Sequence, residues 1–447
     1  MEHLVIIGNG ISGITLARHV RKNSKMRITV VSAESDYFFS RTALMYVYMG
    51  HMKFEHTQPY ENNFWRKNKI ELVNDFVEGV DVSKKQLHLK KGGTHGYDKL
   101  VIASGSKSNK FGWPGQDLKG VQGLYSKQDL ELLEENSNNA VRAVIVGGGL
   151  IGVELAEMLA SRGIKVTFLV REKRFWGNVL PKEEGALISK HILNDHYIDL
   201  RFENNLKEII SDDNGRVKSI IIEETGEEIS CQIVGLTAGV SPNIDFLKDS
   251  SIELQRGVMV NRYLETNIPD VYALGDCAQF HEAAPGRRPI EQVWYTGRMM
   301  GETLAKTLTG DKTMYEPGYW FNSAKFFDIE YQTYGTVLGE LQEGQQQFYW
   351  EHPEGRICFK MVFNASNKRV VGVNVFGIRM RHHVWDKWLQ EGRDANYVME
   401  HLRDANFDPE FYKLYETDIV SLYNSETGEN IKPKKKSWKR MLQALNR

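Results

Sequence analysis

The sequence predicts an α/β protein with two Rossmann-like dinucleotide-binding domains and a smaller α+β domain after them. Two glycine-rich loops, starting at Gly8 and Gly147, support the first part, because each lies between a short apolar strand and a helical segment. From about Tyr315, aromatic and alternating runs typical of antiparallel strands appear, which supports the second part. The 447 residues allow about three globular units.

The first dinucleotide-binding unit is predicted to begin at residue 3. Residues 3–7 form an apolar run that ends at Gly8, which predicts a buried parallel strand entering a tight turn. A helical segment is expected from about Ser12 to Lys22, and a second strand over residues 27–32. Together these elements form one βαβ unit.

The same order recurs in the middle of the chain. Residues 142–146 and 165–170 are expected to be strands, with a turn at 147–152 and a helix from Val153 to Ser161 between them. Before this second unit, residues 105–123 are rich in glycine and proline, which is typical of a crossing between domains.

The last part of the chain has a different character. The runs Ala324 to Tyr334, Phe348 to His352 and Ile357 to Phe363 predict an antiparallel sheet, and Trp385 to Arg403 predicts a helix.

Charge and cysteine content narrow the function classes. The net charge is -1, so no overall field favours nucleic acid. Three distant cysteines indicate a reducing compartment rather than a disulfide scaffold. The first strand begins at His3, which leaves no room for a signal peptide, and no apolar run reaches the roughly 18 residues of a spanning helix. We therefore expect a cytoplasmic protein.

The first loop, Gly8-Asn9-Gly10-Ile11-Ser12-Gly13, carries the first binding prediction. Its glycines let the backbone approach a pyrophosphate, and the following helix offers free N–H groups to the phosphate charge. Glu34 lies where an acid accepts from ribose hydroxyls. A glycine-rich turn without a ligand is the alternative.

The second loop, Gly147 to Gly152, predicts a site for the second dinucleotide. Where an NADH site usually has an acid, this chain has Val170 or Arg171, depending on alignment. Arg171 and Arg174 can face a 2′-phosphate, which favours NADPH, whereas Glu172 leaves NADH open. A solvated charged turn is the competing interpretation.

Two strand ends complete the pattern. Residues 97–105 run from Tyr-Asp into Ala103-Ser104-Gly105, and residues 271–276 end in Gly275-Asp276. A glycine there allows a cofactor to pass close to the backbone, and Asp276 can accept from a ribityl hydroxyl or simply cap a helix.

These four motifs, in this order over residues 1–310, resemble those of the two-dinucleotide-domain flavoprotein reductases, which include the pyridine nucleotide–disulfide oxidoreductases. The resemblance implies FAD at the first and last motifs, NADH or NADPH at the third, and an FAD domain made of two segments. The expected domains are residues 1–110 and 241–312 for FAD, 111–240 for NAD(P)H, 313–430 for an α+β interface domain, and a tail at 431–447.

In this family the disulfide reductases carry a Cys-x4-Cys pair after the first ribose-binding strand, and the NADH oxidases carry a single cysteine there. Asp36 to Leu44 contains no cysteine. That stretch resembles the branch of rubredoxin and ferredoxin reductases and apoptosis-inducing factor, which implies that Arg41 contacts the FAD diphosphate. This branch also pairs a lysine with the glutamate matched by Glu154, the expected catalytic residue. Tyr46 stands near that lysine's place, which leaves the tuning of the flavin open.

Lys127 stands where relatives often have an FAD-contacting arginine, and Trp294 lies in the segment beside the flavin, where a core aromatic is the alternative. The residues expected to contact the cofactors are Gly8, Gly10, Ile11, Ser12, Gly13, Glu34, Arg41, Val80, Ala103, Ser104, Gly105, Lys127, Gly147, Gly149, Leu150, Ile151, Gly152, Arg171, Gly239, Gly275, Asp276 and Trp294.

The resemblance predicts an FAD-dependent NAD(P)H oxidoreductase. Hydride would pass from NAD(P)H to N5 of FAD, and electrons then to an external acceptor, a small redox protein of the rubredoxin or ferredoxin type. Two alternatives stay open: a type II NADH dehydrogenase-like quinone reductase at the membrane surface, and a slow regulatory flavoprotein that senses NAD(P)H. A homodimer is also left open.

No metal site is expected, because His382 and His383 are adjacent and point in different directions. In the tail, Trp438, Met441, Leu442 and Leu445 share one face of a short basic helix. Such a helix can pack on the chain itself or remain disordered, or it can contact a partner or an anionic membrane.

Overall fold

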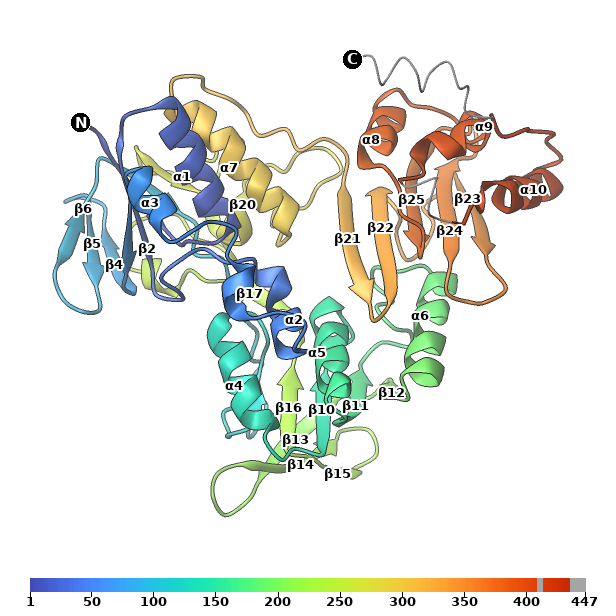
Figure 1. The fold of residues 1–447 in the computed structure, drawn as a ribbon, viewed down its shortest axis with the longest axis horizontal. Coiled ribbons are helices and arrows are strands. Elements are labelled where there is room, and N and C mark those ends of the chain that lie inside the picture. Colours follow the sequence, from blue (N-terminus) through green and yellow to red (C-terminus); the bar gives the residue numbers. More distant parts are fainter. Residues whose placement is uncertain (408–412, 435–447) are drawn as a thin grey trace. The chain divides into compact units, whose positions relative to one another are not determined.

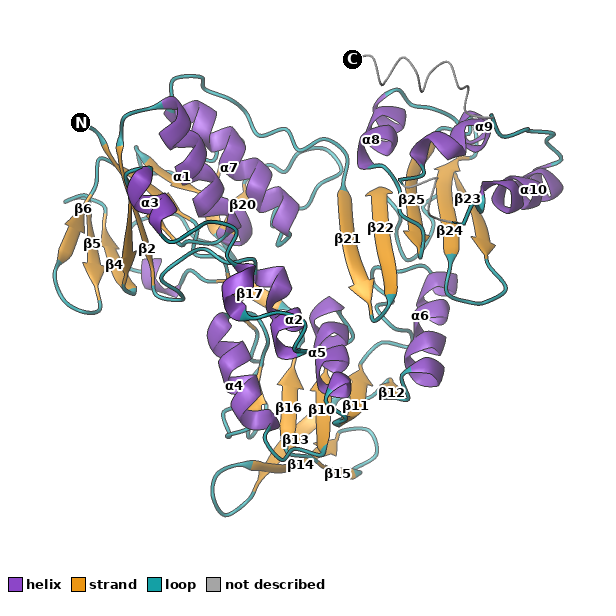
Figure 2. Ribbon diagram, in the orientation of Figure 1, coloured by secondary structure: helices purple, strands orange, loops and turns teal. Residues whose placement is uncertain are grey.

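The computed structural model describes residues 1–407 and 413–434, whose helices and strands are drawn in Figures 1 and 2. These elements divide into two compact units. Unit 1 contains Met1–Arg171 and Glu203–Pro317. Unit 2 contains Glu172–Phe202 and the chain from Gly318 onward.

The first sheet of unit 1 is parallel and has the order β19-β7-β1-β2-β3. Its strands are β1 (His3–Ile7), β2 (Arg27–Ser32), β3 (Ile70–Asn74), β7 (Lys99–Ile102) and β19 (Val271–Ala273). Because β19 follows β7 only after a long excursion of the chain, two separated segments form one sheet. The predicted discontinuous domain is confirmed at this level.

Two helices of the domain that contains this sheet pack against each other. They are α1 (Ile11–Asn23) and α7 (Trp294–Leu308), which lie side by side in Figure 1. A Cβ on Gly297 would lie 2.4 Å from the Ser12 hydroxyl, and a Cβ on Gly301 would lie 2.7 Å from the Ser12 carbonyl oxygen. The two glycines, one turn apart, therefore let α7 approach the start of α1.

The second parallel sheet of unit 1 contains β11 (Lys165–Val170), β10 (Arg142–Val146), β16 (Ile233–Leu236) and β9 (Val121–Gln122), in this order. Helix α5 (Leu150–Ser161) follows the glycine-rich loop, and α4 (Lys127–Ser137) begins at a capping box in which the Ser126 hydroxyl accepts from the Asp129 N–H. The predicted strands at 142–146 and 165–170 are confirmed.

The remaining elements of unit 1 are short. They are η1 (Arg41–Ala43), α2 (Leu44–Tyr48), η2 (Phe54–Thr57), α3 (Asn63–Lys67), β4 (Val77–Asp81), β5 (Gln86–Leu89), β6 (Thr94–Gly96), β8 (Ser106–Ser108), β13 (Leu206–Ser211), β14 (Val217–Ile222), β15 (Glu228–Ser230), β17 (Val240–Pro242), η3 (Asp245–Leu247), β18 (Val258–Val260), η4 (Gly275–Cys277) and β20 (Ala278–Phe280).

Unit 2 is built on an antiparallel sheet of order β21-β22-β25-β24-β23. Its elements are α6 (Lys182–Asp195), β12 (Asp199–Phe202), β21 (Phe321–Phe326), β22 (Ile329–Gly335), β23 (Gln345–Glu351), β24 (Cys358–Asn364), β25 (Val370–Phe376), α8 (His382–Gln390), α9 (Ala395–Ala405) and α10 (Glu416–Thr427). The predicted antiparallel sheet is confirmed.

The structure gives detail to one local prediction in unit 2 and corrects another. The run Ala324 to Tyr334, predicted as part of an antiparallel sheet, covers the hairpin between β21 and β22, because the chain reverses at Phe327, whose φ is +56°. The segment from Trp385 to Arg403 forms parts of two helices rather than one. Gly392 takes a φ of +63°, and the Asp394 side chain caps the second helix by accepting from the Tyr397 N–H at 2.8 Å.

Unit 2 buries ionisable side chains beside its sheet. Lys360 is fully buried, and its Nζ lies 2.8 Å from Glu183 Oε2 and 2.9 Å from Gln347 Oε1. Glu184 is also fully buried; its Oε2 accepts from the Asn374 amide at 2.9 Å, and its Oε1 has no hydrogen-bond partner. Burial raises the pKa of Glu184 to about 7.

Among the described residues, no helix is both long and apolar enough to cross a bilayer. The amphipathic tail predicted at the end of the chain lies outside the described residues from residue 435 on.

Candidate functional site

The first glycine-rich loop joins β1 to α1, and its three glycines have different surroundings. A Cβ on Gly8 would lie 2.1 Å from the Ala103 carbonyl oxygen, and a Cβ on Gly13 would lie 2.2 Å from the Gly8 carbonyl oxygen. A Cβ on Gly10 would meet nothing within 4 Å. Gly8 and Gly13 therefore serve close packing of the backbone, whereas Gly10 borders open space at the N-terminus of α1, where an anion is favoured.

The second loop repeats this arrangement between β10 and α5. A Cβ on Gly147 would lie 2.7 Å from the Thr237 carbonyl group, and a Cβ on Gly152 would lie 2.4 Å from the Gly147 carbonyl oxygen. A Cβ on Gly149 would meet nothing within 4 Å. The Thr237 hydroxyl donates to the Gly147 carbonyl oxygen at 3.1 Å, which ties β16 to the loop.

Three predicted residues from distant segments meet after β2. The Arg41 guanidinium donates to both carboxylate oxygens of Glu34 at 2.6 Å, and the Lys127 N–H donates to Glu34 Oε1 at 3.0 Å. Burial acts to lower the pKa of Arg41, but the hydrogen bonds and charge of Glu34 outweigh it, and the pKa is raised. Arg41 is therefore a fixed positive charge at this end of the site.

Asp276 lies in η4, directly after β19, and is surrounded by protein although it retains some solvent access. Its Oδ2 accepts from the Tyr125 hydroxyl at 3.1 Å, and the Tyr125 oxygen accepts from the Ser106 N–H at 3.0 Å. Burial raises the pKa of Asp276, while Tyr125 and Arg41 act in the opposite direction. The N-cap residue of η4 is Leu274, and Asp276 is the second residue of this short helix.

The segment before α7 is fixed by a buried ion pair. Arg287 donates to both carboxylate oxygens of Glu291 at 2.6 and 2.7 Å, and their side chains are only 3% and 2% exposed. The next residue, Gln292, donates to the Ser106 hydroxyl at 2.8 Å. Trp294 begins α7, partly buried, with its ring edge-to-face against Tyr295. These contacts hold the positive N-terminal end of α7 in place.

Val170 and Arg171, the two candidates for the position where an NADH site usually has an acid, differ in exposure at the end of β11. Val170 is fully buried beneath the second loop, since a Cβ on Gly148 would lie 2.8 Å from its side chain. Arg171 is exposed at the carboxyl end of the strand. Among the described residues, Arg174 is paired with Glu340 at 2.9 Å.

Glu154 and Tyr46 come from helices that pack together, α5 and α2. Glu154 is partly exposed on α5. Tyr46 stacks on His51 with ring centroids 6.0 Å apart. The structure thus places an aromatic ring, instead of a lysine, on the helix beside α5.

All three cysteines are buried and free of disulfides. The Cys277 thiol donates to the carbonyl oxygens of Ile102 and Leu274, both at 3.4 Å. Burial raises the pKa of Cys277, raises the pKa of Cys231 to about 12, and raises that of Cys358 well above its ordinary value. None is therefore a thiolate at neutral pH, which is the form needed for disulfide exchange.

Three other predicted residues, Ser104, Gly105 and Gly239, follow strands of the two parallel sheets, whereas Val80 does not. The Ser104 hydroxyl donates to the Asn243 carbonyl oxygen at 2.7 Å, and Gly105 and Gly239 have φ values of +71° and +86°. Val80 lies in β4, buried in the hydrophobic core of unit 1.

Sequence reasoning missed three residues that the structure joins to this site: Tyr125, Ser106 and Gln292. Each lies within two residues of a segment already selected, next to Gly105, Lys127 or Trp294. Proximity in sequence was the available signal, but the hydrogen-bond chain that links them to Asp276 became visible only in the fold.

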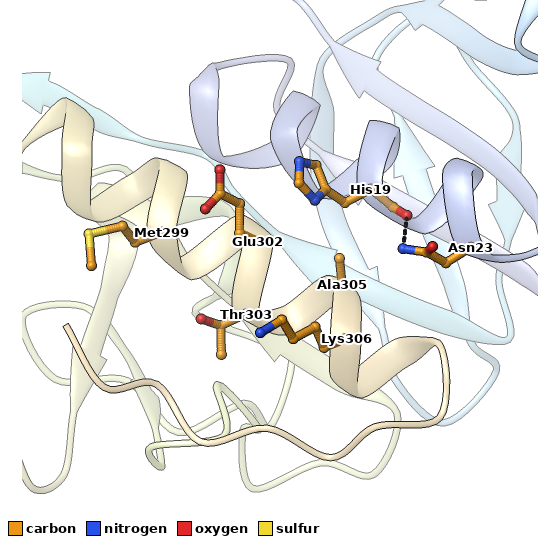
Figure 3. Close-up of a pocket in the computed structure, with 7 residues that line it drawn as sticks. All are labelled: His19, Asn23, Met299, Glu302, Thr303, Ala305 and Lys306. Carbon is orange, nitrogen blue, oxygen red and sulfur yellow. Dashed lines mark hydrogen bonds between the residues drawn. The ribbon is translucent and has the colours of Figure 1, made fainter. Parts of the chain in front are cut away.

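A separate hollow of about 310 Å³ lies between the later turns of α1 and α7 (Figure 3). It is lined by His19, Asn23, Met299, Glu302, Thr303, Ala305 and Lys306. Because Gly10 lies at the opposite end of α1, this hollow is not the dinucleotide site.

The residues present fit FAD and a nicotinamide dinucleotide. Each glycine-rich loop has open space at one glycine, Gly10 in the first loop and Gly149 in the second, where a pyrophosphate needs the backbone to be accessible. At the first loop, Glu34 and Asp276 supply carboxylates suited to ribose and ribityl hydroxyls. The fold and this site define a flavoprotein oxidoreductase with two dinucleotide-binding domains.

The comparison with known families agrees with this class. Residues 2–301 match the model of the pyridine nucleotide-disulphide oxidoreductase family, and the chain belongs to that family. The predicted FAD and NAD(P)H cofactors and oxidoreductase class are confirmed at the level of the family.

Two relatives illustrate the similarity. The NADH-rubredoxin oxidoreductase of Clostridium acetobutylicum is 30% identical over 63% of this chain and 70% of its own length. The nitrite reductase [NAD(P)H] of Bacillus subtilis is 27% identical over 84% of this chain, and the match spans 46% of that longer protein. The chain thus covers less than half of the nitrite reductase.

A solved structure shows the same fold. The ferredoxin reductase from Rhodopseudomonas palustris superimposes with a TM-score of 0.78 at 22% identity, covering 94% of this chain and all of that one.

Proposed function

We propose that this chain passes electrons from NAD(P)H, through FAD, to a small redox protein of the rubredoxin or ferredoxin type, without a cysteine relay. The main supporting observation is the pair of open glycine-rich loops in a protein whose cysteines are all buried thiols. Rubredoxin and ferredoxin appear in the names of the relatives described above.

Each part of the site has a physical task. Bound FAD would supply the hydride acceptor and the donor of electrons to the partner protein. The N-terminus of α1 binds the pyrophosphate, Glu34 accepts from ribose hydroxyls, and Arg41 holds Glu34 in orientation while it offers a positive charge to the diphosphate. Asp276, oriented by Tyr125, accepts from a ribityl hydroxyl.

The remaining residues act on the reacting end. The N-terminus of α7, fixed by the Arg287–Glu291 pair, favours negative charge on the flavin. Glu154 on α5 is proposed to position the nicotinamide face, with Tyr46 near the place of the usual lysine.

Acceptor choice is tested with the FAD-loaded full chain under anaerobic conditions. We expect turnover with a rubredoxin or a [2Fe–2S] ferredoxin to exceed turnover with a soluble quinone at least about 10-fold, a difference of roughly 1.4 kcal/mol in barrier height. Faster turnover with the quinone would contradict the redox-protein acceptor. Slow turnover with every acceptor would favour the sensing role, and failure of both nucleotides to reduce the flavin would overturn the whole proposal.

Nucleotide preference is predicted to depend on Arg171. Arg171→Ala should lower kcat/KM for NADPH about 10-fold and change that for NADH less than about two-fold, because only NADPH carries the 2′-phosphate. Arg174→Ala is the matched control: it removes a second arginine from the same turn, one whose guanidinium pairs with Glu340. Equal losses for the two nucleotides in Arg171→Ala would show that Arg171 does not read the phosphate.

A further inference from the structure

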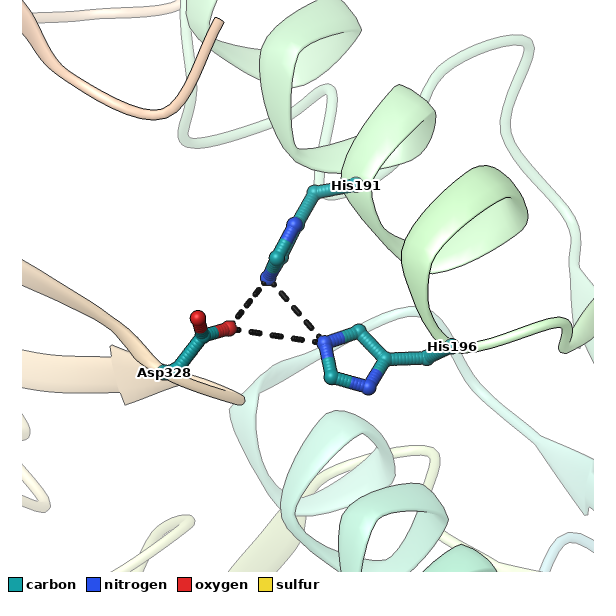
Figure 4. A group of neighbouring side chains, drawn as sticks. All are labelled: His191, His196 and Asp328. Atoms are coloured by element: carbon teal, nitrogen blue, oxygen red, sulfur yellow. Dashed lines mark hydrogen bonds and ion pairs between the residues drawn. The ribbon is translucent and has the colours of Figure 1, made fainter. Parts of the chain in front are cut away.

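A cluster of nitrogen and oxygen atoms converges in unit 2, where the end of α6 faces the β21–β22 hairpin (Figure 4). His191 Nε2 lies 3.1 Å from His196 Nε2 and 2.6 Å from Asp328 Oδ1. His196 Nε2 lies 3.4 Å from the same Asp328 oxygen. Three ligand-type atoms from three side chains thus surround one point.

The orientation of the His191 ring is fixed by a contact of its other nitrogen, Nδ1. Its side chain is 1% exposed, and its Nδ1 lies 2.6 Å from Oδ2 of Asp195, one helical turn later. In the tautomer that donates the Nδ1 proton to this carboxylate, the Nε2 lone pair is directed into the cluster. Histidines that bind metals are usually oriented by such a carboxylate on the other ring nitrogen.

The spacing fits a metal. Ligands about 2.0–2.1 Å from a tetrahedral Zn²⁺ lie roughly 3.3 Å apart. The distances from His196 Nε2 to the other two atoms, 3.1 and 3.4 Å, match this value. The third distance, 2.6 Å, requires a small outward shift of Asp328, whose side chain is 55% exposed on a hairpin turn and has room for it.

We propose that His191, His196 and Asp328 bind one divalent transition-metal ion, Zn²⁺ or a similar ion, with water as the remaining ligand. Two imidazole nitrogens and one carboxylate oxygen suit Zn²⁺ and its neighbours, and not Ca²⁺ or Mg²⁺, which prefer oxygen ligands. The exposed sides of Asp328 and His196 leave access for that water.

A metal-free ion-pair network is the competing explanation. Arg356 donates to Asp328 Oδ2 at 3.2 Å and to Asp195 Oδ2 at 2.9 Å, so both carboxylates already have a cationic partner. However, Arg356 contacts Oδ2 of Asp328 and leaves Oδ1 to the histidines. The network also puts the two Nε2 atoms 3.1 Å apart before that oxygen, at hydrogen-bonding distance, and one bound cation can replace the proton between them.

The ring of the second histidine is held in place by stacking. The His196 ring stacks on Phe327, with centroids 3.9 Å apart. A metal at this point would cross-link the end of α6 to the hairpin, two segments that are far apart in sequence.

The test uses the FAD-loaded full chain, stripped with a chelator and then exposed to Zn²⁺. We expect one zinc per chain after desalting and a rise in melting temperature on the order of 5 °C when Zn²⁺ is about 100-fold above its Kd. Co²⁺ should give the absorption bands of a four-coordinate site at longer wavelengths than oxidised flavin.

Variants separate this site from adventitious binding. His196→Gln and Asp328→Asn should each weaken zinc binding at least about 10-fold, whereas His383→Gln, an exposed histidine of the same unit, should bind as the wild type does. Asp328→Asn changes a half-exposed turn, so it keeps the test valid if His196→Gln does not fold. Equal zinc retention by the wild type and Asp328→Asn, or no zinc-dependent rise in melting temperature, would overturn the proposal.

Discussion

Gly10→Ala is expected to leave the protein folded while it weakens FAD binding at least about 10-fold. The added methyl group meets no protein atom within 4 Å, so the fold has no reason to change. It would project into the open space before α1, where the pyrophosphate needs close contact with the backbone. Fluorescence titration of the stripped protein with FAD measures the affinity, and circular dichroism measures the fold.

Gly8→Ala is the matched variant in the same loop, with the opposite outcome. Its Cβ would lie 2.1 Å from the Ala103 carbonyl oxygen, and its φ of +111° is strained for any side chain. We expect a loss of roughly 3 kcal/mol or more in the free energy of unfolding. Wild-type FAD affinity in Gly10→Ala, or wild-type stability in Gly8→Ala, would contradict the roles assigned to the two glycines.

Glu184→Gln is expected to stabilise unit 2 above neutral pH by about 1–3 kcal/mol. Glu184 is fully buried, and burial raises its pKa from 4.5 to about 7. As pH rises from 4.5 towards 7, the unfolded chain loses this proton while the folded chain keeps it, so stability falls. Above pH 7 the folded protein holds a buried carboxylate, whereas glutamine has no charge to bury.

The pH dependence provides the control for this variant. The groups around Glu184 are Asn374, Lys360, Glu183, Tyr331 and Cys358, and the substitution changes none of them. At pH 5 Glu184 is protonated in the folded state, so the gain should shrink below about 1 kcal/mol. Denaturant unfolding at pH 5 and pH 8.5 measures both values. An equal effect at the two pH values would show that the carboxyl group does not titrate as stated.

Several elements could be predicted closely because their cause is local. The strands at 27–32, 142–146 and 165–170 match the observed bounds, since short β-rich runs next to glycine-rich turns leave little alternative. The helices after Gly10 and Gly149 begin slightly earlier than predicted, at Ile11 and Leu150, because helix starts depend on backbone geometry that residue type only suggests.

Other features depend on contacts that no local pattern contains. Tyr125 meets Asp276, and His191 meets Asp328, although each pair is more than 130 residues apart in sequence. In the sequence, the histidines considered as metal ligands were the adjacent His382 and His383. His191 and His196 lie five residues apart around the end of α6. Loop closure and sheet pairing bring such side chains together.

The sequence by itself determined the two glycine-rich loops, the four ordered motifs and the absence of a cysteine near the first ribose-binding strand. These follow from backbone sterics and from residue identity, which are local properties. Only the tertiary structure decided which glycine is open to a ligand, which partner orients Asp276, and whether the cysteines can ionise. Those properties depend on which distant atoms surround a group, and therefore on how the whole chain packs.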